Sequence, residues 1–320
     1  MARASRVYKV GTRRSLLATT QTGAILSELK KAHPDVSFEI TEIVTKGDRI
    51  QGVALSQVGG KGLFISEIED AILSGKVDFA VHSMKDVPAQ LAPGLVVGAI
   101  PLREDPRDLL ITKGKHVLRT LPEGASVGTS SLRRSAQLKR LRPDLAIETL
   151  RGNIDTRLRR LEGLDAIVLA TAGLARMGWW GNGGFAHPDF SYHAFPIGTD
   201  DMVPAVGQGA LALECRALDD DVLSLLMAIH NPLTATCVGV ERAFLERVGG
   251  SCQVPVAAHA VIEQGGHNVS LQAMIGLPDG SIVVKGESHG SPDDDLGTVL
   301  ADQLLEKGGS DILKSLATLS

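Results

Sequence analysis

The most constraining feature of this 320-residue sequence is an alternation of short apolar segments with amphipathic ones, which occurs twice. In the first hundred residues, the pattern predicts strands at 7–10, 36–44, 79–81 and 95–100 and helices at 15–32 and 63–73. It starts again after 109–111, with strands expected at 126–129, 145–150 and 166–170 and helices at 131–141 and 154–161. Alternating strands and helices form a mostly parallel sheet with helices on both faces. The sequence therefore predicts an α/β protein with two doubly wound lobes.

The remaining third of the chain has a different pattern. We interpret 177–201 as a loop-rich excursion between domains, and 211–215 as a strand that returns to the first sheet. From about residue 232, a helix at 234–248 is followed by three strand-like runs and a closing helix, at 254–262, 269–275, 281–287 and 296–307. Turn signals separate the three strands as hairpins. This part predicts a small α+β domain with a three-stranded antiparallel sheet.

Composition excludes several classes of protein. The formal net charge of −4 argues against a chain whose whole surface binds nucleic acid or anionic membrane. The three cysteines, Cys215, Cys237 and Cys252, include no C-x-x-C pair. Neither a disulfide framework nor a zinc site follows from them, and we expect no metal.

The N-terminal residues and the lengths of the apolar runs indicate in which cellular compartment the protein is expected. Basic residues at 3–6 have no apolar segment behind them, so we identify no signal peptide. No apolar run approaches the roughly 20 residues of a membrane span. We therefore expect a cytoplasmic protein.

Arginines and hydroxyl side chains gather at three strand-to-helix junctions. These junctions are Gly11-Thr12-Arg13-Arg14-Ser15, the segment 128–134 with Thr129, Ser131, Arg133 and Arg134, and the segment 151–157 with Arg151 and Arg157. Cations in a first helical turn oppose the helix dipole, whereas the free N–H groups there favour an anion. Ligands bind at this edge of open α/β sheets. The junctions predict a partner with several carboxylates or phosphates, although solvated arginines at helix ends are the simpler alternative.

Two further segments could act on such a partner. Asp86 follows a buried strand and is either a turn former or a carboxylate that holds a cationic centre or exchanges a proton with a substrate. Lys61 lies among glycines in 58–64, which suits a mobile lid over a ligand or a plain structural turn. This segment lacks the spacing of a phosphate-binding P-loop.

One cysteine differs from the other two. We expect Cys215 and Cys237 to be small core residues. Cys252 follows the glycine pair at 249–250, which lets the backbone approach another surface. It is a core residue, a nucleophile or an attachment point for a cofactor.

These segments together resemble a known family. The motifs are 81–88 (VHSMKDVP), 128–134 (GTSSLRR), 150–153 (LRGN), 204–209 (PAVGQG) and 250–255 (GSCQVP). In this order they resemble the porphobilinogen deaminase (hydroxymethylbilane synthase) family, and the likeness extends from Val7 to the C-terminal helix.

The resemblance implies a fold and an activity. Two domains would resemble the lobes of type II periplasmic binding proteins, with domain 1 at 1–105 and 205–228, domain 2 at 106–204 and domain 3 at 229–320. The family is usually monomeric and carries a dipyrromethane cofactor on a cysteine thioether in the third domain. It adds four porphobilinogen units head to tail, losing ammonia each time. Hydrolysis then releases hydroxymethylbilane for haem and other tetrapyrroles.

The resemblance also implies roles for individual residues. Cys252 would carry the cofactor, and Asp86 would be the catalytic carboxylate. Residues expected to bind the cofactor are Ser83, Lys85, Thr129, Ser131, Arg133 and Arg134. Residues expected to bind the substrate or growing chain are Arg13, Ser15, Lys61, Arg151, Arg157 and Gln208.

Two departures and two alternatives accompany this interpretation. Many family members have Gly where this chain has Ser251, and some have Lys at the position of Gln57. A non-enzymatic two-lobed polyanion-binding protein would also explain the arginines, though not Cys252 or the third domain. An RNA-binding protein would require a more basic surface.

Overall fold

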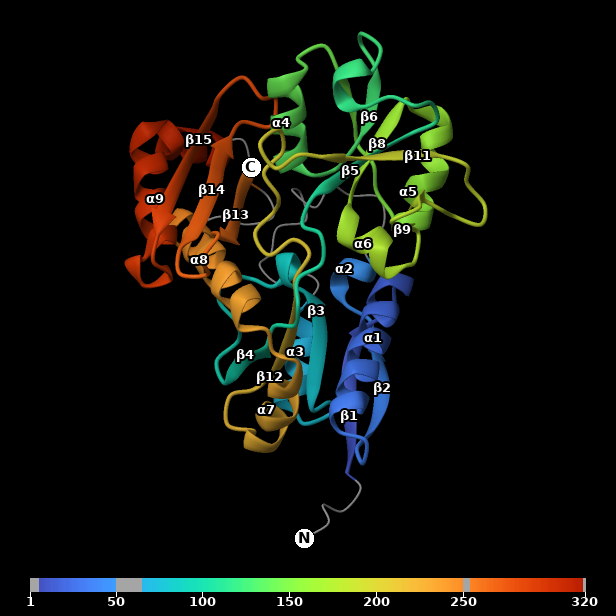
Figure 1. Cartoon of the computed structure of the whole chain (residues 1–320), viewed down its shortest axis with the longest axis vertical. Coiled ribbons are helices and arrows are strands. Elements are labelled where there is room, and N and C mark those ends of the chain that lie inside the picture. Colours follow the sequence, from blue (N-terminus) through green and yellow to red (C-terminus); the bar gives the residue numbers. More distant parts are fainter. Residues whose placement is uncertain (1–5, 50–64, 250–253, 319–320) are drawn as a thin grey trace. The chain divides into compact units, whose positions relative to one another are not determined.

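The computed structural model describes residues 6–49, 65–249 and 254–318. The chain divides into two compact units, each made of two chain segments. Met1–Arg103 with Ala210–Ala235 form the first unit, and Glu104–Gly209 with Thr236–Ser320 form the second. Figure 1 shows the elements of each unit by label and colour. The three-domain boundaries expected from the sequence remain a prediction.

The first unit is built on a five-stranded sheet with the order β2-β1-β3-β12-β4. Its strands are β1 (Val7–Arg13), β2 (Ser37–Ile43), β3 (Phe79–Ser83), β4 (Leu95–Ala99) and β12 (Leu211–Arg216). Its helices include α1 (Leu16–Ala32), α2 (Lys46–Arg49), α3 (Ser66–Leu73) and α7 (Asp220–Leu226). The expected helix at 63–73 is confirmed from Ser66 onward, and its first residues lie outside the described part.

Alternate residues of the first sheet pack on its two faces. Phe79 and Val81 of β3 join the cluster of α1 and α7, which includes Leu29 and Leu225. Ala80 projects to the opposite face, where it packs with α3. Helices therefore cover both faces, as the alternation of strands and helices predicts.

The second unit contains a five-stranded sheet with the order β11-β5-β8-β6-β7. Its strands are β5 (Asp108–Thr112), β6 (Ser126–Gly128), β7 (Ala146–Glu148), β8 (Ala166–Ala170) and β11 (His193–Ile197). Its helices are α4 (Leu132–Leu141), α5 (Ile154–Arg160) and α6 (Thr171–Arg176). Leu138 of α4 packs on one face and Leu158 of α5 on the other.

The two sheets share one topology, in which four strands run in one direction and one strand runs opposite to them, so the expectation of a mostly parallel sheet is confirmed. β1 pairs in parallel with β2 and β3, and β6 with β7 and β8. β12 is antiparallel to β3, and β5 is antiparallel to β8. β5 precedes the other strands of its sheet and β12 follows those of its own, so neither is reached through a right-handed helical crossover.

The expectation of a loop-rich excursion at 177–201 is wrong in part. β11 pairs with β5 and completes the second sheet, and β9 (Trp180–Gly181) pairs with β10 (Gly184–Phe185). Pro196 lies within β11, and proline weakens a strand pattern in a sequence. The structure accommodates it because β11 is an edge strand.

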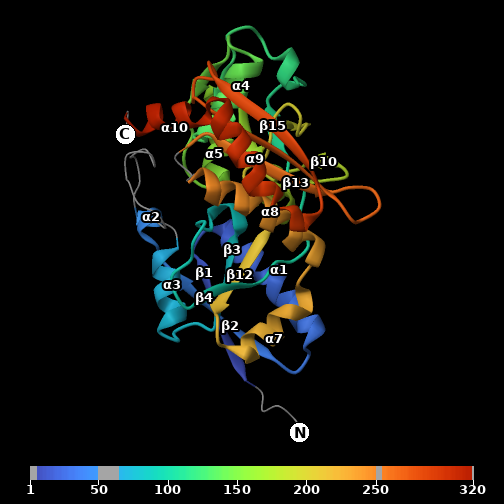
Figure 2. The ribbon, with the colours of Figure 1, turned by 90° about the vertical axis from the view of Figure 1, so that its left-hand side faces the viewer.

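The C-terminal part of the second unit forms a three-stranded antiparallel sheet, as predicted. β13 (Val256–Ile262), β14 (Val269–Gly276) and β15 (Val283–Gly290) pack with α8 (Pro232–Val248) and α9 (Leu296–Leu304). Figure 2 shows α9 lying along this sheet. The closing helix continues beyond α9 as a π turn at Leu305–Gly309, and Gly308 (φ 111°) forms a kink before α10 (Ser310–Ala317), which the sequence analysis did not predict.

The length and hydropathy of a helix determine whether it could cross a membrane. Among the described residues, no single helix is long and apolar enough to cross a membrane. One sharply bent pair, Asp220–Ile229 with Pro232–Val248, meets these criteria by length and composition only.

Candidate functional site

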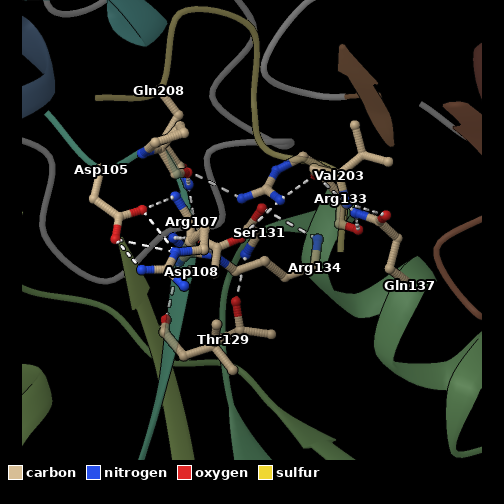
Figure 3. A network of polar contacts seen from close by, with 12 residues as sticks. Asp105, Arg107, Asp108, Thr129, Ser131, Arg133, Arg134, Gln137, Val203 and Gln208 are labelled. Atoms are coloured by element: carbon tan, nitrogen blue, oxygen red, sulfur yellow. Dashed lines mark hydrogen bonds and ion pairs between the residues drawn. The ribbon is translucent and has the colours of Figure 1, made fainter. Parts of the chain in front are cut away.

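Asp108 is the centre of a buried polar network in the second unit (Figure 3). It begins β5, and its side chain is fully buried. Its Oδ1 accepts hydrogen bonds from Arg134 Nε at 3.1 Å and Nη2 at 2.7 Å. Its Oδ2 lies 2.8 Å from Arg133 Nη1. Arg134 Nη1 also donates to the Val168 carbonyl at 2.9 Å, so its guanidinium is held inside the lobe.

The segment before β12 completes this network. Gln208 is 1% exposed, and its Nε2 donates to Asp108 Oδ1 at 2.9 Å. Its Oε1 accepts from Arg133 Nη2 at 3.4 Å. Arg133 Nη1 also donates to the Val203 carbonyl at 2.8 Å. Gln137 bonds both backbone groups of Val203, which fixes this segment against α4.

The hydroxyl residues of the same junction begin α4. Ser131 is the N-cap of α4, and its Oγ accepts from Arg134 N at 3.4 Å. Thr129 Oγ1 accepts from Ser131 N at 3.1 Å. The structure therefore brings Thr129, Ser131, Arg133 and Arg134 of this junction together with Gln208, which the sequence analysis did not connect to them.

The charge of this network is unbalanced. Burial by itself would raise the pKa of Asp108, but attraction by Arg133 and Arg134 outweighs it and holds the pKa well below its usual range. Burial lowers the pKa of Arg133, which Asp108 opposes. Because Asp105 is paired with Arg107, the residues labelled in Figure 3 carry one excess positive charge. Carboxylates of a dipyrromethane would offset it, so the residues present fit that group.

The third junction begins α5. Asn153 is its N-cap and accepts from Thr156 N at 2.9 Å. Arg157 Nε donates to the Gly152 carbonyl at 2.8 Å. Arg151 is half-buried and lies in the turn between β7 and α5.

In the first unit, the segment after β3 carries the expected catalytic carboxylate. Met84–Asp86 form a single 3₁₀ turn, held by Met84 N donating to the Ala210 carbonyl at 3.0 Å. Ser83 Oγ donates to Gln21 Oε1 at 3.3 Å. Lys85 is half-buried, whereas Asp86 is exposed. The short turn therefore leaves the Asp86 carboxylate exposed to solvent.

The first junction has the same construction as the second. Arg13 ends β1 and is half-buried, and Ser15 is the N-cap of α1, accepting from Ala18 N at 3.3 Å. Thr22 Oγ1 donates to Thr12 Oγ1 at 2.9 Å, and both residues are buried.

Some expected residues lie outside the described part of the chain. These are Lys61, Cys252, Gln57 and Ser251. Cys215 and Cys237 are buried, as expected, and burial raises the pKa of Cys215 to about 11. Within residues 6–49, 65–249 and 254–318, no group of three or more His, Cys, Asp or Glu side chains could hold a metal ion.

The charged residues that the sequence does not single out include Asp108, which is fully buried, and Arg176, which is half-buried. Asp108 could have been noticed, since a carboxylate at the start of an apolar strand requires a partner. Arg176 ends α6, away from the three junctions, and its Nη2 donates to the Gly209 carbonyl. Burial lowers the pKa of Arg176 to about 10, although Glu104 opposes this effect.

Comparisons with known proteins cover nearly the whole chain. Residues 8–224 match the family described as porphobilinogen deaminase, dipyromethane cofactor binding domain, and residues 235–306 match the porphobilinogen deaminase C-terminal domain. Porphobilinogen deaminase of Listeria innocua is 48% identical over 97% of this chain and 98% of its own length. That of Brevibacillus brevis is 50% identical over 96% of each chain.

Two solved structures show a weaker likeness. A probable amino-acid ABC transporter extracellular-binding protein from Bacillus subtilis is 12% identical, with a TM-score of 0.39 over 70% of this chain and 90% of its own. The BenM effector binding domain is 14% identical, with a TM-score of 0.41 over 71% and 91%. These scores are low, so the description of the fold rests on the strand orders given above.

Proposed function

The chain belongs to the porphobilinogen deaminase family of tetrapyrrole biosynthesis, and we propose that the residues above carry out its reaction as follows. The enzyme condenses four porphobilinogen units head to tail with loss of ammonia, and water releases hydroxymethylbilane. The observation that carries the assignment of residues is the buried pair of guanidiniums around the single carboxylate of Asp108.

Residues of two segments would hold the dipyrromethane. We assign its attachment to Cys252, and its carboxylates to Arg133 and Arg134 with Thr129 and Ser131. Ser83 and Lys85 would contribute from the segment after β3. When bound, this cofactor supplies the pyrrole to which the first substrate unit is joined. A covalent anchor keeps the reacting ends near one another, which lowers the entropic cost of each condensation.

Asp86 would act on the incoming substrate. Loss of ammonia from porphobilinogen leaves a methylene-pyrrolenine with cationic character, which a nearby carboxylate stabilises. The same carboxylate can hold a proton during departure of the amine. Its exposure in the chain by itself leaves it accessible to a substrate.

The remaining cations would bind the substrate and the growing chain. Each porphobilinogen brings two carboxylates, so negative charge accumulates as the chain grows. We assign these carboxylates to Arg13, Arg151, Arg157 and Lys61, with Ser15 and Gln208 assisting. Guanidiniums suit this role because they bind carboxylates through two parallel hydrogen bonds.

We further propose a cytoplasmic monomer that binds neither nucleic acid nor membrane. The near-neutral charge balance and the scarcity of aromatic residues support this proposal. We retain the three-domain division at 1–105 with 205–228, 106–204 and 229–320 as part of it.

The mass of the intact denatured protein tests the cofactor assignment. We expect wild type to exceed the mass of its bare chain by two pyrrole units, and Cys252→Ala to match the bare chain. Cys237→Ala is the matched control and keeps the excess. If wild type matches its bare chain and gains no mass with porphobilinogen, the deaminase assignment is wrong, and a polyanion-binding protein becomes the better interpretation.

Turnover separates an enzyme from an anion receptor. Asp86→Ala should lower kcat by about 100-fold or more, the range for a positioned acid or base. Asp35→Ala removes an exposed carboxylate of the same unit and should retain normal kcat. A receptor would lose no activity and would bind polyanions at least as well after Asp86→Ala.

A further inference from the structure

Glu241 is a fully buried carboxylate in the middle of α8. Its Oε2 accepts a hydrogen bond from Gly207 N at 2.6 Å, and its Oε1 accepts from Ala260 N at 2.8 Å. His259 Nδ1 lies 3.3 Å from Oε1. One side chain therefore joins α8, the turn at 204–209 and β13, all within the second unit.

The turn that Glu241 holds has a backbone that needs support. Gly207 has φ 69° and Gly209 has φ 90°, so both occupy the left-handed region that favours glycine. A Cβ on Gly209 would lie 2.4 Å from the Glu104 carbonyl oxygen. Between these glycines, Gln208 points into the protein, and its Nε2 donates to the Pro106 carbonyl at 2.6 Å.

Gln208 connects this turn to the arginine cluster. It donates to Asp108 at 2.9 Å and accepts from Arg133 at 3.4 Å. A short bond from a backbone N–H to a carboxylate is charge-assisted and stronger than a neutral one. The bond between Gly207 N and Glu241 thus limits where Gln208 can lie, and Gln208 limits the positions of Asp108 and Arg133.

We propose that Glu241 is a positioning residue for the anion-binding arginines, acting through Gly207 and Gln208 on Asp108 and Arg133. The proposal rests on the assignments given above, of Gln208 to binding of the substrate and of Arg133 to the carboxylates of the cofactor. Glu241 itself need not touch the substrate or the cofactor. A purely structural Glu241, which only joins α8 to β13, would change stability without changing the affinity for substrate.

The decisive variant is Glu241→Gln, which keeps the shape of the side chain. Its amide can no longer present an oxygen to both Gly207 N and Ala260 N, so an N–H group faces another N–H group. We expect KM for porphobilinogen to rise about tenfold, the equivalent of one charge-assisted hydrogen bond. Leu300→Ala is the stability control, because Leu300 is buried in the same C-terminal core but has no polar group that could join these hydrogen bonds.

A double-mutant cycle tests the route of the effect. Gln208→Leu should raise KM by itself, and Glu241→Gln should add less than about twofold in that background, because coupled residues are not additive. Fully additive effects would overturn the proposed route. So would a KM of Glu241→Gln within about twofold of wild type when its Tm falls as far as that of Leu300→Ala.

Hydrogen exchange provides a readout that does not depend on activity. Glu241→Gln should accelerate amide exchange at 203–209 more than Leu300→Ala of equal Tm does, because the turn loses its carboxylate acceptor. Unchanged exchange at 203–209 would overturn the proposal. Failure of the deaminase assignment is seen separately, as a wild-type protein with neither the dipyrromethane mass nor turnover.

Discussion

The two lobes share a strand order but place their buried carboxylates differently. Asp108 of β5 lies opposite Ala170, at the carboxyl end of β8. Glu214 of β12 lies opposite Ala80, near the start of β3. Ligands of open α/β sheets bind beyond the carboxyl ends of the strands. Only the carboxylate of the second lobe is therefore placed to organise a ligand site.

The groups that contact these two carboxylates also differ between the lobes. Two guanidiniums face Asp108, whereas His82 Nε2 lies 2.8 Å from Glu214 Oε2. Glu69 of α3 is near this second pair, and burial raises the pKa of Glu69. One architecture thus holds a cation-rich cluster in one lobe and an imidazole–carboxylate pair in the other. The side chains at the sheet edge determine anion binding, and the topology alone does not.

Asp108→Asn should have the largest effect. Breaking a buried ion cluster leaves two guanidiniums without their carboxylate, and we expect a loss of about 3–5 kcal/mol in the free energy of unfolding. KM for porphobilinogen should rise at least about tenfold because Gln208, assigned above to substrate binding, is no longer held by the Asp108 carboxylate. Urea unfolding and steady-state kinetics measure both. Normal stability would show that Asp108 does not organise the cluster.

The pH dependence of the destabilisation by Asp108→Asn tests the direction of the Asp108 pKa shift. The folded pKa of Asp108 lies below its unfolded value, so its contribution to stability is complete above the unfolded pKa, about 4. That contribution is lost as pH falls through the folded pKa. The difference in unfolding free energy between wild type and Asp108→Asn should shrink below about pH 4. A difference that grows on acidification would contradict the lowered pKa.

Glu214→Gln should destabilise less and leave substrate affinity unchanged. It replaces one member of a buried pair, at a cost of about 1–3 kcal/mol. KM should stay within about twofold of wild type, because Glu214 lies away from the ligand edge. The same two measurements apply. A KM change as large as that of Asp108→Asn would remove the distinction between the lobes.

Alanine substitutions at two corresponding glycines, one in each sheet, should have the smallest effects. Gly11 pairs with Ala80 and Gly128 with Ile167, at corresponding places in the two sheets. A Cβ would lie 2.7 Å from Leu164 Cδ1 at Gly128 but 3.3 Å from Ile43 Cδ1 at Gly11. We expect Gly128→Ala to cost about 1–3 kcal/mol and Gly11→Ala less than about 1 kcal/mol by urea unfolding. Equal losses of unfolding free energy at the two positions would show that the packing around both glycines adjusts equally well to an added methyl group.

Much of the fold could be predicted from hydrophobic periodicity. β3 and β8 are almost wholly buried and read as continuous apolar runs, so their positions were predictable. The position of β11 was not predictable, because it contains Pro196 and its partly exposed residues form neither an alternating nor a continuous apolar pattern. The mixed direction of each sheet was also hidden, since pairing direction depends on residues far apart in sequence.

Part of the candidate site could likewise be predicted from the sequence, and part could not. The junction residues Thr129, Ser131, Arg133 and Arg134 could be singled out locally, because arginines beside free helix N–H groups need an anion. Asp108 and Glu241 could not be linked to them, since each reaches its partners only when distant segments pack together.

The α/β class, the antiparallel C-terminal sheet and the family follow from the amino-acid sequence, because periodicity and ordered motifs are properties of neighbouring residues. Which charges are buried together depends instead on the tertiary packing. Arg134 donates to the carbonyl of Val168, and Gln208 reaches Asp108 from a hundred residues away. The strength of such contacts depends on burial and on distances of a few ångströms, which sequence spacing does not contain.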